Sequence, residues 1–244
     1  MAYQEFQPHP ILKPYIDAYW LSQGDRPEPV RQRIYPDGCI DIILNLGGEF
    51  LTDSGVLKMK SHSAYLVGTM TRYKDTVMQS DTVLIGIRFK PLGFTAFFKF
   101  PSLHEITEKT IDFNNNLLPE IHRCDSGTIF LLNKFFCDRL SVRDHSLFGV
   151  IETINRKNGI ISIEEVAKKH FTTGRQLERK FRQYVGISPK EYANFMRYRY
   201  AFQLIKKKSF DKNLLDIALD SGFYDHAHLT NEVKKYSGLL ASQL

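Results

Sequence analysis

The sequence has few of the features that mark secreted, membrane-spanning or metal-binding proteins. Its three cysteines, Cys39, Cys124 and Cys137, are scattered and follow no CxxC or Cys/His metal spacing. We therefore expect free thiols in a reducing compartment, no metal site and no cofactor. No apolar run approaches the roughly 18 residues of a membrane span. Residues 1–10 are polar and interrupted by prolines, unlike a secretory signal. These absences predict a cytoplasmic protein that does not contact a membrane.

The positive charge of the chain is confined to one end. Residues 151–244 contain 17 Lys and Arg against 10 Asp and Glu, whereas the first 150 residues contain 16 against 17. The net charge of +6 therefore arises in the C-terminal part. This asymmetry favours a polyanionic partner for that part, and a solvated basic face is the alternative. A hydrophobic content of 43% in 244 residues is typical of a folded chain with room for two domains.

The pattern of the first half predicts short strands separated by turns. Apolar runs at residues 33–35, 39–46, 64–68 and 82–89 are divided by turn signals rich in proline, aspartate and glycine. Such a series favours an antiparallel barrel or sandwich. Residues 114–116 predict a loop.

One amphipathic helix is expected in the first half, over residues 128–140. We expect its aromatic side chains to pack on the barrel, with a dimer contact as the alternative; these side chains are Phe130, Phe135 and Phe136.

The sequence of the first half indicates no catalytic site. The isolated histidines offer a metal no ligand set, and we expect them to be structural or exposed; they are His9, His62 and His104. Cys39 follows the turn glycine Gly38 and is expected to be a small buried hydrophobe rather than a reactive thiol. Asp37 and Asp41 are expected to cap a turn rather than to form an acid/base pair.

An aromatic group near the N-terminus consists of Tyr15, Tyr19 and Trp20, the only tryptophan. These residues could line a ligand pocket, but we expect core packing.

In the second half, three helix starts fit the capping-box pattern, at residues 162–165, 173–176 and 188–191. In this pattern a hydroxyl accepts the third helical amide while a Glu or Gln reaches back to the cap. Asn213 with Asp216 is a weaker version. Several such starts in register with apolar periodicity predict a run of capped helices.

The first two of these helices predict a helix-turn-helix unit. A short helix over residues 163–170 is followed by a tight connection and a second helix over residues 173–184. Leu177 and Phe181 would face inward, and the small Ala167 would let the two helices approach.

The pattern repeats about 52 residues later, with helices over residues 214–221 and 225–236. The corresponding positions, with a slip of one residue in the turn, are Ala167 and Ala218, His170-Phe171 and Gly222-Phe223, Leu177 and Leu229, Phe181 and Val233, and Gly186 and Gly238.

A long helix over residues 188–207 would join the two units. Its apolar stripe consists of Tyr192, Phe195, Met196, Tyr200 and Leu204. About 20 residues span roughly 30 Å, close to the roughly 34 Å between successive major-groove faces. The linker could therefore hold both units on one side of a DNA duplex.

Residues 147–244 resemble the AraC/XylS family of transcription regulators. The residues that carry the resemblance are Ala167, Phe171, Thr173, Leu177, Arg179, Phe181, Gly186, Pro189, Tyr192, Arg197, Ala201, Leu204, Ile217, Ala218, Gly222, Phe223, Asp225, His228, Leu229 and Gly238. The first half is similar to a cupin-like effector-sensing domain found in one branch of that family. The matching stretches are residues 9–10, 15–16, 19–20, 36–43, 67–69 and 86–91.

The resemblance implies an α+β chain of two domains. Residues 1–143 would form a β-rich, cupin-like regulatory barrel with flanking helices, and residues 144–244 an all-α double helix-turn-helix joined by the linker helix. The implied function is sequence-specific, double-stranded DNA binding that regulates transcription without catalysis, as an activator or as a repressor. RNA polymerase, a small-molecule effector and a second copy of the chain are further partners that the resemblance leaves open.

Carried over by position, the base-facing residues of the first unit are Arg175, Gln176, Glu178 and Arg179, and those of the second are His226, Ala227, Thr230 and Asn231. Arg can pair with guanine, Glu can accept from cytosine and Asn can bind adenine. Residues further along the two helices are expected to contact phosphates; these are Lys180, Arg182, Lys234 and Lys235.

The second unit departs from the family pattern. Tyr224 stands where a small residue is frequent, so the cap is expected at Asp225. Asn231 and Glu232 replace the usual Arg, and Ala241 stands where proline is common. We therefore expect the first unit to supply most of the specificity. An alternative function is a DNA-repair methyl acceptor, acting through Cys39, or a cupin-type enzyme fused to DNA-reading units.

Overall fold

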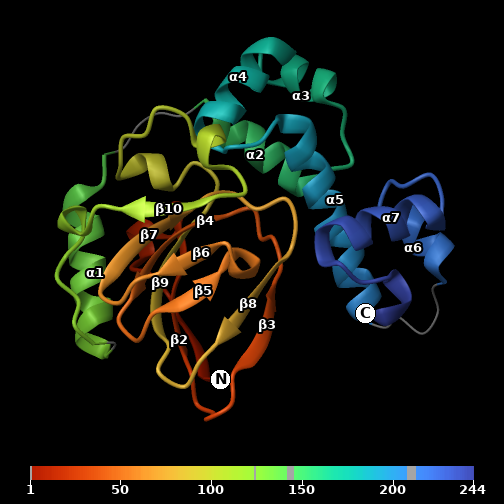
Figure 1. Cartoon of the computed structure of the whole chain (residues 1–244). Coiled ribbons are helices and arrows are strands. Elements are labelled where there is room, and N and C mark those ends of the chain that lie inside the picture. The colour runs from red at the N-terminus through yellow and green to blue at the C-terminus, as the bar shows by residue number, and fades with distance from the viewer. Residues whose placement is uncertain (1, 124, 142–145, 208–212) are drawn as a thin grey trace.

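The computed structural model describes residues 2–123, 125–141, 146–207 and 213–244. A β-rich part is followed by a helical part, as predicted from the sequence (Figure 1). The expected domain boundary between residues 143 and 144 lies outside the described residues, as does Cys124.

Ten strands form the β-rich part. They are β1 (Ala2–Phe6), β2 (Ile16–Gln23), β3 (Val30–Ile34), β4 (Ile40–Asn45), β5 (Phe50–Thr52), β6 (Leu57–Met59), β7 (Ser63–Val67), β8 (Lys74–Met78), β9 (Val83–Phe89) and β10 (Thr110–Phe113). Six of them pair antiparallel in the order β1-β2-β9-β4-β7-β10, while β3 pairs with β8 and β5 with β6. The sheets are open, so the barrel shape arises from the packing of sheets and not from a closed ring of hydrogen bonds.

Both faces of the six-stranded sheet are covered. Its strands therefore have apolar residues at consecutive positions, and not only at every second position. One face packs against α1 (Ser126–Arg139), whose Leu132 and Phe136 are fully buried in the larger core cluster. The expected packing of this helix on the barrel is thus confirmed, although Phe130 points outward and is 72% exposed. The other face carries a smaller cluster that includes Trp20 and Phe50.

Short 3-10 helices lie between the strands, between β10 and α1, and at the C-terminus. They are η1 (Pro10–Leu12), η2 (Asp53–Gly55), η3 (Phe94–Ala96), η4 (Leu103–Ile106), η5 (Asn115–Leu117) and η6 (Ala241–Gln243). The loop expected at residues 114–116 is the start of η5, where the side chain of Asn114 accepts a hydrogen bond from the Asn116 amide.

The helical part contains α2 (Leu147–Arg156), α3 (Ile163–Lys169), α4 (Gly174–Tyr184), α5 (Pro189–Lys206), α6 (Leu214–Asp220) and α7 (His226–Ser237). Each predicted capping box is present with both of its reciprocal hydrogen bonds, at Ser162, Thr173, Ser188 and Asn213. The local pattern of a cap followed by Glu, Gln or Asp therefore located the start of four helices. None of the described helices is both long and apolar enough to cross a bilayer.

The helical part has two hydrophobic cores, and α5 contributes to both. The first joins α2, α3 and α4 to Tyr192 and Ala193, and the second joins α6 and α7 to Phe195 and Tyr198. Leu92, from the β-rich part, is 2% exposed and belongs to the first of these cores. The first helix-turn-helix unit is therefore packed onto the N-terminal domain by a shared core.

The turn of the second helix-turn-helix unit is one residue longer than the turn of the first. The sequence pairing of the two units puts this extra residue in the wrong place. Phe171 has φ 50° and Gly222 has φ 74°, so these two left-handed residues correspond, whereas the sequence pairing placed Gly222 opposite His170. His170 and Ser221 are the equivalent helix ends, with φ of −102° and −93°. The extra residue lies between Gly222 and the cap of α7, because from Asp225 onward the offset is 52 residues.

Candidate nucleic-acid interface and N-terminal cavity

Helix α4 turns its apolar side chains inward and its polar ones outward. Leu177 and Phe181 are 1% and 0% exposed and belong to the first core. Arg175, Gln176, Arg179 and Arg182 are exposed, and Glu178 is half-buried. The predicted base-facing residues of the first unit thus lie on an accessible helix.

Four of the polar side chains on α4 already have partners within the molecule, and one of them, Lys180, donates to the Ser146 hydroxyl at 2.8 Å. Gln176 Oε1 accepts from the Thr173 amide at 3.3 Å and from the Thr172 hydroxyl at 2.8 Å, as the capping box requires. Arg182 Nε donates to Glu178 Oε1 at 2.7 Å. Arg175 and Arg179 have no recorded ion pair with any described residue, which leaves their guanidinium groups available to an outside acceptor.

Helix α7 presents a similar but less basic surface. His226, Ala227, Asn231 and Lys234 are exposed, whereas the Thr230 hydroxyl donates to the His226 carbonyl of its own helix at 2.8 Å. Asp225 caps the helix by accepting from the His228 amide at 2.7 Å, as expected. His228 stacks on the exposed Tyr224 ring, with centroids 5.9 Å apart.

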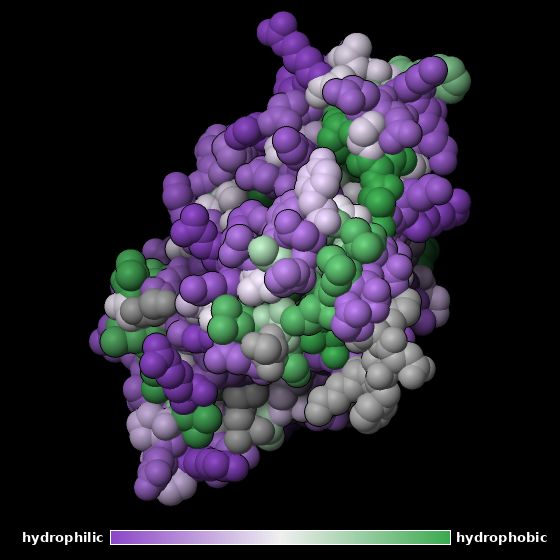
Figure 2. Space-filling view, turned by 90° about the vertical axis from the view of Figure 1, so that its right-hand side faces the viewer, coloured by the Kyte–Doolittle hydropathy of each residue, from purple (hydrophilic) through white to green (hydrophobic). Residues whose placement is uncertain are grey.

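Helix α5 separates the two units, which lie toward its opposite ends (Figure 1). Its 18 residues correspond to about 27 Å of helix rise. The face of the molecule on the side of α6 and α7 is largely hydrophilic, with hydrophobic residues in an interrupted strip (Figure 2).

The N-terminal domain contacts the C-terminal end of α4 through a set of hydrogen bonds. The hydroxyls of Thr69 and Thr107 donate to the carbonyls of Val185 and Gly186, each at 2.7 Å. His104, in η4, places Nδ1 2.8 Å from the Gly186 carbonyl and Nε2 2.7 Å from Arg182 Nη1. A neutral His104 with its proton on Nδ1 satisfies both contacts, because Arg182 can only donate. Arg182 is therefore held between Glu178 and the N-terminal domain.

A second contact joins the N-terminal domain to α5 and α7. Arg33 Nη1 donates to the Ser237 carbonyl at 3.3 Å, and the rings of Tyr35 and Phe202 lie 5.9 Å apart. A Cβ on Gly38 would lie 2.7 Å from the Phe195 ring, so only glycine allows this close approach.

A cavity of about 370 Å³ lies within the β-rich domain, between the six-stranded sheet and the two small sheets. Its wall includes Trp20, which fits the ligand-pocket alternative, whereas Tyr19 is fully buried in the core, as expected. Arg33, Tyr35 and Gly68 also line the cavity, and they belong to or adjoin the residues that contact the helical domain. The cavity and the interdomain contact therefore share a wall.

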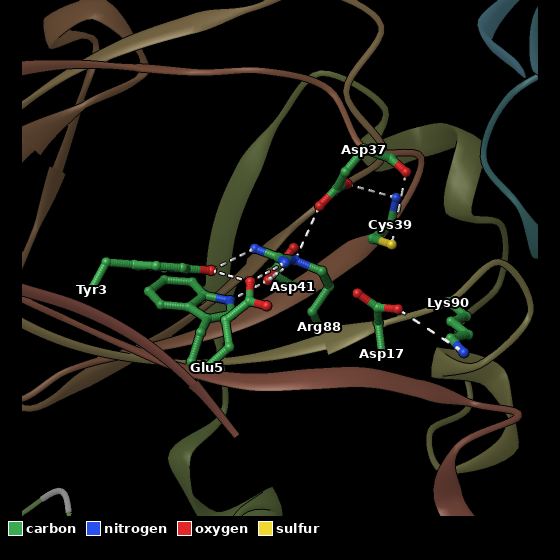
Figure 3. A network of polar contacts seen from close by, with 9 residues as sticks. Tyr3, Glu5, Asp17, Asp37, Cys39, Asp41, Arg88 and Lys90 are labelled. Atoms are coloured by element: carbon green, nitrogen blue, oxygen red, sulfur yellow. Dashed lines mark hydrogen bonds and ion pairs between the residues drawn. The ribbon is translucent and has the colours of Figure 1, made fainter. Parts of the chain in front are cut away.

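One end of the cavity is ionic (Figure 3). Arg88 of β9 lies among three carboxylates: Nη1 is 2.9 Å from Glu5 Oε1, and Nε is 3.0 Å from Asp37 Oδ2 and 3.8 Å from Asp41 Oδ1. Trp20 Nε1 donates to Asp41 Oδ1 at 2.7 Å. We call Glu5, Asp37 and Asp41 the carboxylate cluster.

Burial changes the protonation of the groups at this end. Burial, followed by the charge of Asp37, raises the pKa of Asp41 to about 7, against the opposing effects of Arg88 and Trp20. Burial and the neighbouring carboxylates of Asp37 and Asp41 also raise the pKa of the Cys39 thiol well above its usual range. Cys39 is therefore a thiol and not a thiolate at neutral pH, as expected, although the residue is half-buried and not fully buried.

The other candidates of the first half have structural roles. Asp37 Oδ1 accepts from the Cys39 amide at 2.8 Å, so this aspartate does cap the turn. His9 accepts from the Ile11 amide at the start of η1. Within the described ranges no group of three or more His, Cys, Asp and Glu side chains is placed to hold a metal ion.

Sequence reasoning missed the residues that join the domains and the arginine of the cavity. Arg88 and Thr69 lie within the stretches similar to the cupin-like domain, so the signal was present but indicated fold alone. In the sequence His104 is an isolated histidine, because its partners Arg182 and Gly186 lie 78 and 82 residues away.

Two family models match the chain. Residues 4–112 match a domain of unknown function (DUF6597), and residues 166–244 match a helix-turn-helix domain. No curated protein matches the chain in sequence.

Among solved structures, the fold is similar to that of ToxT from Vibrio cholerae. One ToxT structure is 12% identical with a TM-score of 0.50, covering 88% of this chain and 96% of that chain. A second, bound to (E)-4-(8-methylnaphthalen-1-yl)but-3-enoic acid, is 12% identical with a TM-score of 0.50 and covers 88% and 97%. An AraC-type transcriptional regulator from Chromobacterium violaceum is 25% identical over 40% of this chain and 87% of that chain, with a TM-score of 0.38.

Proposed function

We propose that this chain, which joins a domain of unknown function to an AraC-type helix-turn-helix domain, regulates transcription by reading a bipartite promoter site. Helices α4 and α7 would enter successive major-groove faces of one duplex. The observation that carries this proposal is the pair of similarly built helix-turn-helix units at opposite ends of α5. Its rise of about 27 Å is near the roughly 34 Å pitch of DNA.

Within this proposal the residues divide by what they can contact. Arg175 and Arg179 are exposed arginines that suit guanine, and Asn231 suits adenine. The remaining base-facing candidates are Gln176, Glu178, His226, Ala227 and Thr230. To contact a base, Gln176 would first have to release the Thr173 amide, and Glu178 would have to release Arg182. The residues assigned to phosphates are Lys180, Arg182, Lys234 and Lys235.

The N-terminal domain would modulate DNA binding through the contacts at the end of α4. Arg182 donates Nε to Glu178 and Nη1 to His104, so a phosphate that used these same donors would compete with both contacts. A small molecule in the cavity could change them, because the cavity shares a wall with the interdomain contact. A ToxT structure of similar fold contains a bound small organic acid, which supports the idea of an effector but not its identity.

Fluorescence anisotropy of the full chain with labelled DNA would test the proposal. DNA from upstream of its own gene would be compared with scrambled DNA at several salt concentrations. We expect preferential binding to the upstream DNA and a steep fall of log affinity with log salt. Equal, salt-insensitive binding to both DNAs would overturn the proposal.

Two variants would separate specific from general contacts in the same assay. Arg179→Ala should cost roughly 1–3 kcal/mol on the preferred site, because it removes a base contact. Lys234→Ala should weaken binding to all sequences about equally. Arg156→Ala is the matched control, since Arg156 is exposed on α2 and paired with Glu152. An unchanged affinity of Arg179→Ala would remove that residue from the interface.

The rival function, a methyl acceptor or cupin-type enzyme, is less well supported. A methyl acceptor needs a thiolate, whereas burial and carboxylates keep Cys39 protonated. Stoichiometric alkylation of Cys39 by methylated DNA would revive it.

A further inference from the structure

We propose that the cavity of the N-terminal domain binds a small amphiphilic cation. The charged group of the ligand would lie against Asp37 and Asp41, and its apolar part would lie among Trp20 and the methionines of the wall. This inference rests on the proposed function, in which the domain responds to a small molecule.

The charges around the cavity favour a cation. Among the described residues, Arg88 is the only basic side chain paired with the three members of the carboxylate cluster, so one positive charge stands against three acidic side chains. The other basic residues of the wall are already neutralised. Lys74 pairs with Asp53 at 2.9 Å, and Arg33 binds Asp75 through two nitrogens at 2.9 and 3.2 Å.

The carboxylate cluster also has acceptors to spare. With the described residues, Glu5 forms hydrogen bonds only through Oε1, and Asp41 interacts only through Oδ1. Glu5 Oε2 and Asp41 Oδ2 are therefore available to a ligand. An ammonium group supplies donors for such oxygens and adds the missing positive charge. A carboxylate ligand would instead add a fourth acidic group to the same place, and burial strengthens that repulsion.

The rest of the cavity suits an apolar body. Three of the five methionines of the chain, Met59, Met70 and Met78, line it together with Leu84. Methionine side chains adapt to the shape of a guest, and the indole of Trp20 can also attract a cation. A volume of about 370 Å³ is within the usual range for small-molecule sites.

The single tryptophan makes the proposal directly measurable. Trp20 lines the cavity and donates to Asp41, so its fluorescence reports on this site alone. The full chain would be titrated with three probes of similar shape: 4-phenylbutylamine, 4-phenylbutanol and 4-phenylbutyrate. We expect the amine to bind about tenfold or more tighter than the alcohol, as for a charge-assisted hydrogen bond, and the acid to bind weakest.

Substitutions would show whether the preference arises at the carboxylate cluster. Asp41→Asn should reduce the amine's advantage over the alcohol to less than about threefold. Asp37→Asn, at a half-exposed position, should also reduce the preference for the amine over the alcohol. This variant provides the test if Asp41→Asn fails to fold. Asp112→Asn, exposed on β10, is the control that should leave the preference unchanged.

The affinity for the amine should also depend on pH. The groups that act on the Asp41 carboxylate are Asp37, Asp17, Arg88 and Trp20. The ligand-free pKa of about 7 means that acidification from pH 8 to pH 6 protonates Asp41. Amine binding should therefore weaken by about tenfold at most over this range, while alcohol binding stays constant.

The outcomes separate this inference from the proposed function. An acid that binds as tightly as the amine, or three probes that leave Trp20 fluorescence unchanged, would overturn the cation proposal. Specific DNA binding in the anisotropy assay does not depend on these probes, so the proposed function would stand. Selective amine binding by a chain that shows no preference among DNA sequences would support the cation site in the cavity. It would overturn the proposal that this site regulates transcription.

Discussion

Asp41 occupies a position in which its ionised form is costly. Its carboxylate is buried beside Asp37, and neither the nearby Arg88 nor the Trp20 indole fully offsets this, so its pKa is raised to about 7. A solvated aspartate ionises near 3.9. The folded chain therefore holds a proton on Asp41 at pH values where the unfolded chain has lost it.

This difference predicts a pH-dependent effect of Asp41→Asn on stability. The protonated Asp41 contributes to the free energy of unfolding. This contribution is fully present below the pKa of Asp41 in the unfolded chain and is lost as pH rises through its folded pKa of about 7. Asn keeps an acceptor for Trp20 but carries no charge to bury. We expect the Tm of the variant relative to the unmodified chain to rise by roughly 5–10 °C between pH 5 and pH 8.

Thermal unfolding followed by circular dichroism would measure this change. Asp112→Asn, on the surface of β10, should show no such pH trend. A relative Tm that falls between pH 5 and pH 8 would show that Arg88 outweighs burial at Asp41.

At the scale of elements, the caps could be predicted and the turns could not. A capping box is a local arrangement of four residues, so Ser162 and Ser188 could be assigned from spacing alone. The register of the turns depends on backbone angles. Because Phe171 adopts a left-handed conformation that usually calls for glycine, its equivalence to Gly222 is not visible in the residue types.

The turn between α3 and α4 holds strain that a substitution can relieve. Phe171 has φ 50° and is 99% exposed, so its side chain offers almost no burial in return. Asn tolerates this conformation better. We expect Phe171→Asn to stabilise the chain by about 1 kcal/mol, measured by chemical denaturation.

The second helix-turn-helix unit supplies the control for this experiment. Tyr224 is also an exposed aromatic residue in a turn, 88% accessible, but it is not left-handed. Tyr224→Asn should therefore bring no such gain. A stabilisation of both variants to the same extent would attribute the effect to the loss of an exposed aromatic ring rather than to backbone strain.

At the scale of the whole molecule, the structure shows how the two domains meet. The sequence indicated two domains through charge asymmetry and motif resemblance. The hydrogen bond from Thr69 to Val185 joins residues 116 positions apart, and nothing in either local sequence specifies it. Contacts of this range depend on the finished fold of both domains, so the pattern of a single sequence could not reveal them.

Removing one of these contacts should release α4 from the N-terminal domain. His104→Ala removes the acceptor of Arg182 and one of the two donors to the Gly186 carbonyl. If the contact competes with DNA, the affinity should rise about three- to tenfold, with a salt slope steeper by about one charge because Arg182 becomes available to a phosphate.

Anisotropy of the full chain at several salt concentrations would detect both changes. His62→Ala, exposed in the turn between β6 and β7, is the matched control. A lower affinity with an unchanged salt slope would mean that His104 supports the DNA-binding arrangement instead of restraining it.

Leu92 adds a constraint on how such chains can be rebuilt. It adopts a left-handed φ of 72°, lies three residues after the end of β9, and is buried in the core of the first helix-turn-helix unit. The second unit has a core of its own, to which no N-terminal residue belongs within the described chain. A chimera that joined this N-terminal domain to another helical domain would leave Leu92 strained and facing a foreign core. Recombination between such chains should therefore succeed more readily when the helical residues that meet Leu92, Arg33 and Tyr35 are exchanged together with the N-terminal domain.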